Sequence, residues 1–138
     1  GVHSVDELPS LLPQADVVVV ITPLTPETRH LVDARFLAAM RDGALLVNVA
    51  RGGVVDTDAL VAEVSRGRVR AALDVTDPEP LPAGHPLWTA PGVLISPHVG
   101  GNSSAFLPRA KALVRAQVGR FATGEPVENV VAGPAGPR

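Results

Sequence analysis

The sequence predicts an α/β fold in which helices flank a parallel β-sheet. Continuous apolar runs such as residues 15–21 are typical of strands buried within a parallel sheet. Segments with the helical spacing of apolar residues follow these runs, and glycine- or proline-rich turns separate the two kinds of segment. Strands that alternate with helices along a chain pair in parallel through right-handed crossovers.

Composition excludes several classes of protein. The chain has 138 residues, enough for one domain, and 46% of them are apolar, enough for one core. Lys+Arg number 12 against 14 Asp+Glu, so we expect neither a nucleic acid nor a membrane as a partner. The absence of cysteine excludes a disulfide scaffold, a cysteine zinc site and a thiol nucleophile.

The first third of the chain predicts a short helix, a strand and a second helix. Ser4 or Asp6 is suited to cap the short helix. The run ADVVVVI at residues 15–21 predicts a strand covered on both faces, because four consecutive valines do not suit a surface half in water. The next helix is expected to begin at Asp33 and to end at Asp42-Gly43. Its apolar face carries Phe36, Leu37 and Met40.

The strand–helix unit then repeats. Residues 44–49 predict a strand, and Asp56 is expected to cap a helix that Gly67 ends. Further strands are expected at residues 69–75 and 93–95, separated by a proline-rich loop. A last helix is predicted from about Ser104 to Thr123, then a strand-forming stub (Val127 to Val131) and a disordered end. The apolar stripe of that helix is Phe106, Ala110, Leu113, Val114, Val118 and Phe121.

Three side chains with useful chemistry lie just after predicted strands or in the loop between them, and parallel sheets bind ligands at the carboxyl ends of their strands. Arg51 precedes two glycines, which let a ligand approach the backbone while the guanidinium grips a carboxylate. Glu79 lies between two prolines that fix its backbone. His98 follows the last strand, and imidazole suits proton transfer near neutral pH.

Each of these residues also has a plainer interpretation. Arg51 suits a solvated loop, Glu79 a surface turn, and His98 a histidine that only donates or accepts hydrogen bonds. The four histidines show no metal-ligand spacing, so we expect no metal site. No lysine and serine or threonine follow the glycines after Arg51, so that loop is not a phosphate-binding loop.

Four sequence motifs, taken in order, are more specific than these general patterns. They are DVVVVITPLT at residues 16–25, LVNVARGGVVD at 46–56, ALDV at 72–75 followed by Glu79-Pro80, and SPHVGG at 96–101. In this order and spacing they resemble the D-isomer-specific 2-hydroxyacid dehydrogenases, a family that includes phosphoglycerate, glycerate, D-lactate and formate dehydrogenases. The resemblance extends over residues 5–131.

The resemblance implies a role for each candidate residue. Arg51 matches the family's substrate-carboxylate arginine, Glu79 the carboxylate that pairs with the catalytic histidine, and His98 the acid/base. The implied activity is hydride transfer between a D-2-hydroxy acid and NAD or NADP, while His98 takes the hydroxyl proton. The implied cofactor-binding residues are Thr22, Pro23, Val49, Ala50, Arg51, Asp74, His98, Gly100 and Gly101, with Asp74 near the nicotinamide carboxamide.

The resemblance also implies what lies outside the chain. Residues 1–123 are expected to be the C-terminal part of a Rossmann-like NAD(P)-binding domain, incomplete because no G-x-G-x-x-G occurs. Residues 124–138 are expected to return to an absent N-terminal substrate domain. The whole protein would be a cytoplasmic homodimer acting on a small 2-hydroxy or 2-oxo acid, and this chain alone would be inactive.

A second hypothesis is a non-catalytic, cofactor-sensing module of the same family, similar to a corepressor. A degraded catalytic set would indicate that role. Arg51, Glu79 and His98 are all present, so the dehydrogenase is the favoured hypothesis. The residues Thr76 and 102–104 depart from the commoner family pattern and leave the substrate open.

Overall fold

Four short strands form one parallel sheet, which confirms the predicted α/β fold. The structure is a computed structural model that describes residues 1–130, and it divides the chain into a unit Gly1–Gly100 and a second that begins at Gly101. The strands of the first unit are β1 (Val17–Val20), β2 (Leu45–Asn48), β3 (Arg70–Leu73) and β4 (Val93–Ile95).

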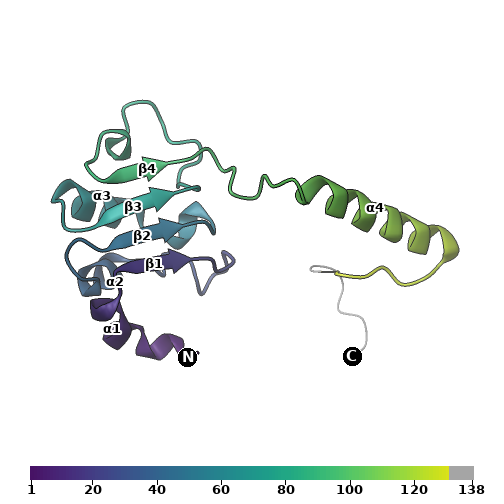
Figure 1. Cartoon of the computed structure of the whole chain (residues 1–138), viewed down its shortest axis with the longest axis horizontal. Helices are drawn as coiled ribbons and strands as arrows, with labels where there is room; N and C mark the ends of the chain where they lie inside the picture. Colours follow the sequence, from purple (N-terminus) through teal and green to yellow (C-terminus); the bar gives the residue numbers. More distant parts are fainter. Residues whose placement is uncertain (131–138) are drawn as a thin grey trace. The chain divides into compact units, whose positions relative to one another are not determined.

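The strand register brings all four carboxyl ends to one edge. The strands pair in the order β1-β2-β3-β4, and all arrows point the same way (Figure 1). The last residues of the strands are partners across the sheet, in the sequence Val20, Asn48, Leu73 and Ile95. The turns that follow the strands therefore start side by side.

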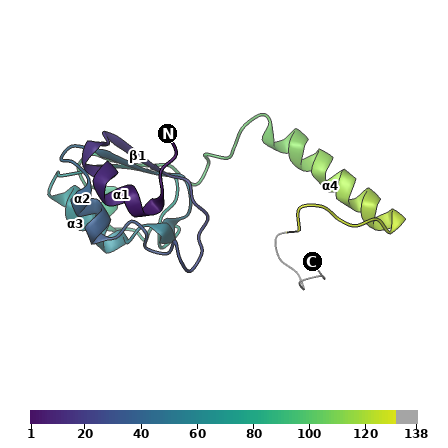
Figure 2. The same cartoon turned by 90° about the horizontal axis from the view of Figure 1, so that it is seen from below.

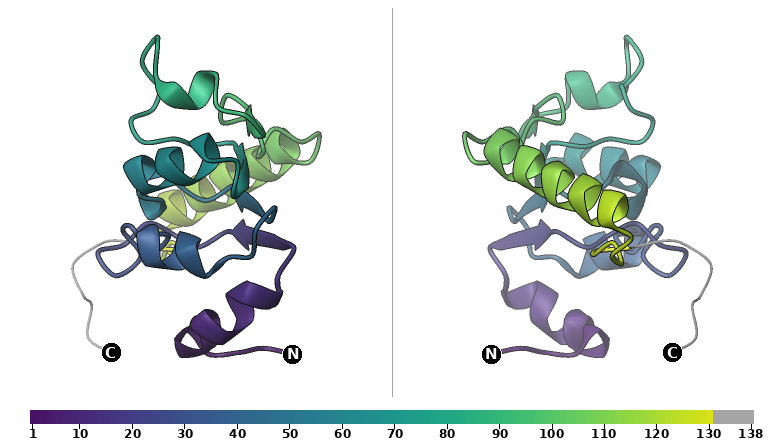
Figure 3. Two further views of the ribbon diagram at one scale, coloured as in Figure 1. Left: turned by 90° about the vertical axis from the view of Figure 1, so that its left-hand side faces the viewer. Right: turned by 90° about the vertical axis from the view of Figure 1, so that its right-hand side faces the viewer.

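The helices of the first unit lie on one face of the sheet (Figures 2 and 3). They are α1 (Leu8–Leu11), which lies between two 3₁₀ turns, α2 (Ala34–Ala39) and α3 (Thr57–Ser65). Asp33 accepts a hydrogen bond from the backbone N–H of Phe36 at 2.8 Å, and Asp56 accepts one from Ala59 at 3.0 Å. Both predicted N-caps are thus confirmed.

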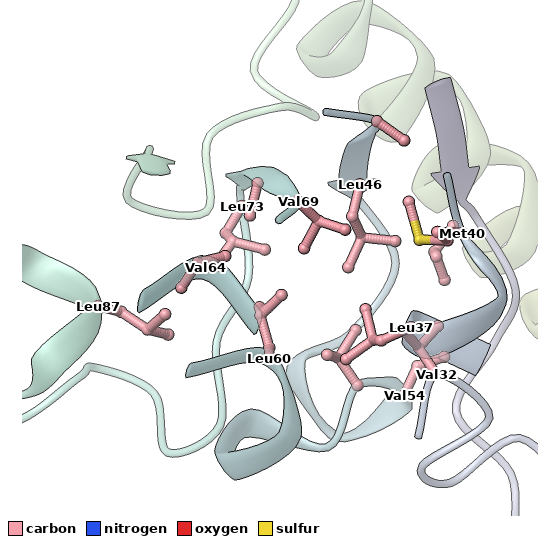
Figure 4. Packing of buried hydrophobic residues seen from close by; sticks show 14 of the residues in the cluster. Val32, Leu37, Met40, Leu46, Val54, Leu60, Val64, Val69, Leu73 and Leu87 are labelled. Atoms are coloured by element: carbon pink, nitrogen blue, oxygen red, sulfur yellow. The ribbon is translucent and has the colours of Figure 1, made fainter. Parts of the chain in front are cut away.

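The core lies between these helices and the sheet. Leu37 of α2 and Leu60 and Val64 of α3 pack toward Leu46 of β2 and Leu73 of β3 (Figure 4). Each of these side chains is at most 4% exposed. Full burial of one such side chain stabilises the fold by about 1.5–3 kcal/mol. This packing fixes the central strands whose ends carry the candidate residues.

The opposite face of the sheet is largely bare, so the prediction of a β1 strand covered on both faces is wrong. Val17 and Val19 are 50% and 53% exposed, and Leu94 of β4 is 70% exposed. The reason is that α1, α2 and α3 all pack on the other face. The valine run therefore indicates a β-branched strand, but not what covers it.

The second unit contains the long helix α4 (Phe106–Thr123), which begins two residues after the predicted start. Gly124, with φ of 71°, ends it in the left-handed conformation that favours glycine. Residues 127–130 form no strand, so that prediction is wrong for them; Arg120 instead bonds to Glu128 and the Pro126 carbonyl. Val131 and the predicted disordered end lie outside the described residues.

Two predictions concern the chain as a whole. Within residues 1–130, no helix is long and apolar enough to cross a membrane. The domain boundary predicted after residue 123 stays a prediction, since the division at Gly100 groups residues by compactness alone.

Candidate functional site

His98 and Glu79 come together at the edge formed by the strand ends. His98 Nδ1 lies 2.6 Å from Glu79 Oε1, although the two residues are 19 positions apart. The loop after β3 carries Glu79, and the turn after β4 carries His98. Because β3 and β4 are paired, their following segments meet.

The pair fixes which imidazole nitrogen is free. An ionised carboxylate only accepts hydrogen bonds, so Nδ1 of His98 donates to Glu79 and Nε2 is left for another partner. The side chains of His98 and Glu79 are 46% and 40% exposed. Ion pairs this exposed contribute at most about 1 kcal/mol to stability. The contact therefore matters mainly for the orientation of the imidazole.

A cavity of about 320 Å³ lies beside this pair. Apolar side chains form most of its wall, and Trp88 is oriented there by a hydrogen bond from its Nε1 to the Pro82 carbonyl at 3.0 Å. The other residues that line it are Asp74, Thr76, Glu79, Pro80, Leu81, Ile95, Ser96, Pro97 and His98. An imidazole beside an apolar recess is suited to a small organic substrate.

Asp74 holds the turn that carries His98. Its carboxylate accepts hydrogen bonds from the Ser96 hydroxyl at 2.6 Å and from the backbone N–H groups of Val99 and Gly100 at 2.9 Å each. The Ser96 bond, followed by those from Gly100 and Val99, lowers the pKa of Asp74 below its ordinary value of 3.8, and His98 adds to this effect. Asp74 therefore stays ionised at neutral pH.

Arg51 lies in a neighbouring cleft and does not line the cavity beside His98. Its Nη1 donates to the Ala50 carbonyl at 2.6 Å, and its exposed guanidinium borders a cleft of about 550 Å³. The structure thus brings together two of the three predicted catalytic residues. Arg51 lies on the adjacent strand end, with its side chain folded back on its own backbone.

The turn that carries Arg51 depends on a residue that the sequence motifs did not single out. Asn48, 1% exposed at the end of β2, accepts a hydrogen bond from the Ala50 N–H and donates one to the Arg51 carbonyl, both at 3.0 Å. A polar residue in an otherwise apolar strand is the signal that could have revealed it, since buried amides need partners. Ser96 was likewise missed.

Gly52 allows the segments that follow β2 and β3 to pack closely. A Cβ on Gly52 would lie 1.9 Å from the Thr76 carbonyl oxygen, so the turn after β2 packs directly on the loop after β3. That loop leads to Glu79. The absence of a side chain at Gly52 therefore lets the Arg51 and Glu79 loops approach each other.

Most of the remaining predicted cofactor residues lie at the same edge of the sheet. Thr22, Pro23, Val49 and Ala50 line the cleft with Arg51. Within the described residues, the buried Oγ1 of Thr22 has no hydrogen-bond partner. Gly100 contacts Asp74, whereas a Cβ on Gly101, in the second unit, would meet no other described atom within 4 Å. Residues 1–130 contain no group of His, Asp and Glu side chains that could hold a metal ion.

Comparison with known proteins decides the family. Residues 1–100 match the family described as "D-isomer specific 2-hydroxyacid dehydrogenase, NAD binding domain". The chain belongs to this family. The resemblance inferred from the four sequence motifs is thereby confirmed, and the conserved fold of the NAD-binding domain accounts for the Rossmann-like sheet.

Relatives and solved structures agree with this family. The chain is 39% identical over 132 residues to the D-3-phosphoglycerate dehydrogenase of Methanocaldococcus jannaschii, covering 95% of this chain and 25% of that protein. It is 44% identical over 93 residues to the human glyoxylate reductase/hydroxypyruvate reductase, covering 67% of this chain and 28% of that protein. The chain therefore spans only about a quarter of the length of these two relatives.

A solved structure of the family carries a cofactor. It is a D-isomer specific 2-hydroxyacid dehydrogenase from Xanthobacter autotrophicus Py2 in complex with NADPH and MES. Its TM-score to this chain is 0.82 at 44% identity, and the match covers 95% of this chain and 54% of that one.

Proposed function

We propose that this chain supplies the acid/base centre and the nicotinamide end of the cofactor site of an NAD(P)-dependent D-2-hydroxyacid dehydrogenase. The observation that carries the proposal is the 2.6 Å contact between His98 Nδ1 and Glu79 Oε1 at the carboxyl edge of the sheet. It leaves Nε2 as the nitrogen able to exchange a proton with a substrate.

The residues at the strand ends fit a nicotinamide group. The orphaned Thr22 hydroxyl can bond to a polar cofactor group, and the apolar side chains of Ile21 and Val49 in the same cleft can pack against an aromatic ring. Thr22, Pro23, Val49 and Ala50 would hold the cofactor from one side. Bound there, NAD(P) would supply the hydride acceptor or donor for the reaction.

Side chains of this chain transfer the proton and bind the substrate carboxylate. His98 Nε2 takes the proton of the substrate hydroxyl as the C2–H bond breaks, and it returns a proton in the reverse reaction. Glu79 holds Nδ1–H and stabilises the imidazolium that forms. Arg51 releases the Ala50 carbonyl and binds the substrate carboxylate through two parallel N–H bonds.

The proposal also includes a homodimer as the state of the whole protein. The proposed substrate is a small 2-hydroxy or 2-oxo acid. The human relative is named for glyoxylate and hydroxypyruvate, and the Methanocaldococcus relative for D-3-phosphoglycerate. All of these compounds carry a carboxylate, which suits the exposed guanidinium of Arg51. We propose this substrate class and no single member of it.

Turnover by the whole protein tests the proposal. Reduction of a panel of 2-oxo acids is followed through NADH and NADPH absorbance for the wild type, His98→Gln and Arg51→Ala. We expect His98→Gln to lower kcat by roughly 10²- to 10⁴-fold. Arg51→Ala should lower kcat/KM by about 100-fold for carboxylate substrates, since charged hydrogen bonds are lost.

Two outcomes would reject parts of the proposal. Wild-type turnover in His98→Gln would reject His98 as the acid/base. Tight NAD(P) binding by the whole protein without turnover of any 2-oxo acid would reject the dehydrogenase and favour the cofactor-sensing module instead. Arg35→Ala is a suitable control, because Arg35 is exposed on α2 and lines neither the cleft nor the cavity.

A further inference from the structure

We propose that Asp74 is a positioning residue that holds the turn 96–100 in the one conformation that directs the His98 imidazole to Glu79. This inference rests on the proposed function for its kinetic consequence. It assigns to Asp74 a task different from contact with the cofactor.

The hydrogen bonds of Asp74 bracket His98 in the sequence. Oδ1 accepts from the Ser96 hydroxyl at 2.6 Å and from the Val99 N–H at 2.9 Å, and Oδ2 accepts from the Gly100 N–H at 2.9 Å. Asp74 lies directly after β3, and it is only 9% exposed. A single carboxylate on the central part of the sheet thus fastens the chain both before and after His98.

The backbone of His98 needs such a restraint. Its φ is 54°, in the left-handed region that residues other than glycine rarely adopt. A conformation of this kind persists only where the surroundings impose it. Besides the bonds to Asp74, the turn has a hydrogen bond from the His98 N–H to the Ser96 carbonyl at 3.0 Å. The Ser96 N–H also donates to the Leu73 carbonyl of β3 at 2.8 Å, which holds the residue at the start of the turn. On the far side of His98, the bonds to Val99 and Gly100 come from Asp74.

Gly100 shows how closely the carboxylate fits the turn. A Cβ at this position would lie 2.9 Å from Asp74 Oδ2, closer than side chains approach one another. The glycine is therefore required by the carboxylate, and not by its own φ, which is not in the left-handed region. The contact makes Gly100→Ala an independent way to displace the carboxylate without removing its charge.

Both oxygens of Asp74 are already used by the protein. An ionised carboxylate has room for further donors, but three bonds from one turn define its position. If Asp74 served chiefly to bind the nicotinamide carboxamide, its loss would weaken cofactor binding. If it acts through His98, its loss lowers the chemical step and leaves cofactor binding nearly intact.

Kinetics of the whole protein separate these two roles. For Asp74→Asn, which keeps the size but loses one acceptor, we expect kcat to fall roughly 10-fold or more while the KM for NAD(P) stays within about 3-fold. Gly100→Ala should lower kcat in the same way, because a Cβ there displaces the Asp74 carboxylate. Asp58→Asn, a change of an exposed carboxylate on α3, is the control and should change neither constant.

Ser96→Ala keeps the test meaningful if Asp74→Asn does not fold. It removes one of the three bonds and leaves the carboxylate in place. We expect a smaller fall in kcat, again with an unchanged KM for NAD(P). A rise of about 10-fold or more in the KM for NAD(P) at unchanged kcat, in Asp74→Asn or Ser96→Ala, would overturn the proposal.

Nuclear magnetic resonance of the whole protein with ¹⁵N-labelled histidine tests the restraint by Asp74 without any turnover. The ring ¹⁵N shifts of His98 should give the signal of a proton fixed on Nδ1 by its bond to Glu79, and this signal should be lost in Asp74→Asn and in Glu79→Ala but persist in Asp58→Asn. Persistence of the signal in Asp74→Asn would overturn the inference. Wild-type turnover in His98→Gln would reject the proposed function alone, because this spectroscopic readout does not depend on the reaction.

Discussion

Single residues at the strand ends determine how closely the loops of the site approach one another. Gly52 is the clearest example, because a Cβ there would overlap the backbone of Thr76. We expect Gly52→Ala to lower the free energy of unfolding by about 1–3 kcal/mol, the usual cost of overpacking. Thermal unfolding monitored by circular dichroism measures this change.

A matched glycine provides the control for that experiment. Gly119 lies inside α4. Apart from its chain neighbours and the adjacent backbone of its own helix, a Cβ there would meet no described atom within 4 Å. Gly119→Ala should therefore be neutral or stabilise the helix by about 0.5–1 kcal/mol. Equal effects of the two substitutions would show that the contact between Gly52 and Thr76 is unimportant.

Asp74 gives the fold a stability that depends on acid pH. Its pKa is lowered by the Ser96 hydroxyl and then by the Gly100 and Val99 N–H groups, so its carboxylate form is favoured in the folded state. The resulting stability is present above the ordinary pKa of 3.8 and is lost as pH falls through the lower pKa of the folded state. Stability should therefore decline below about pH 4.

Urea unfolding at pH 7, 5, 4 and 3 checks this prediction, with the single tryptophan, Trp88, as the fluorescent reporter. The difference between wild type and Asp74→Asn should be largest at pH 7 and should shrink at pH 3. A difference that is constant over this range would contradict the assignment of a lowered pKa to Asp74.

At the scale of whole elements, one arginine binds the carbonyl groups at the C-terminal end of α2. Arg68, which follows α3, donates to the Met40 carbonyl at 2.8 Å and to the Leu37 carbonyl, and it pairs with Glu63. Only 23% of its side chain is exposed, and 14% of Glu63. These bonds tie α2 to α3 on the helical face of the sheet, at residues distant in sequence from the candidate site.

We expect Arg68→Ala to lower the free energy of unfolding by about 2–4 kcal/mol, because it leaves a largely buried carboxylate and two carbonyls without their donor. Arg66→Ala is the control. Arg66 also faces Glu63, at 3.6 Å, but its side chain is 73% exposed. Its removal should change stability by less than about 0.5 kcal/mol, and a similar loss in both variants would refute the role of Arg68.

The elements themselves were largely predictable from local signals. Asp33 and Asp56 predict helix starts because a short acidic side chain satisfies free N–H groups, and the apolar runs locate all four strands. Whether one or both faces of β1 are packed was not predictable, because a run of valines is compatible with either arrangement. Residues 127–130 pair with no described strand, and Arg120 of α4 bonds to Glu128 and to the Pro126 carbonyl, contacts that no local pattern reveals.

The site was predictable in chemistry but less so in geometry. Parallel pairing of β3 and β4 brings Glu79 and His98 together, so strand order alone indicates their approach. The orientation of the Arg51 side chain is decided by a bond to Ala50, which competes with any ligand for the guanidinium. The support from Asn48 and Ser96 depends on close packing that becomes visible only in three dimensions.

For the molecule as a whole, the bare face of the sheet has a physical consequence. Val17, Val19, Ile21, Val49 and Leu94 are between 46% and 73% exposed. Exposed apolar surface of this kind favours association. We expect the 138-residue chain to self-associate at micromolar concentration, as measured by light scattering.

A variant with charged residues on that face can be compared with the wild type for self-association. Val19→Lys with Leu94→Lys should shift the chain toward the monomer, because lysine removes apolar surface and adds charge at the strands. The core between the helices and the sheet should be unaffected, because both substitutions lie on the opposite face of the sheet. A wild-type chain that is monomeric at all concentrations would contradict the prediction.

The central claim is that the Arg51 guanidinium and the His98 imidazole bind one substrate at the carboxyl edge of the sheet, while the Glu79 carboxylate holds the imidazole. A crystal structure of the whole protein with NAD(P) and a 2-oxo acid analogue such as oxamate tests it most directly. We expect Arg51 to have left the Ala50 carbonyl for the carboxylate of the analogue, with its C2 oxygen bonded to His98 Nε2 and Glu79 still on Nδ1. An ordered analogue that touches neither Arg51 nor His98 would contradict the account.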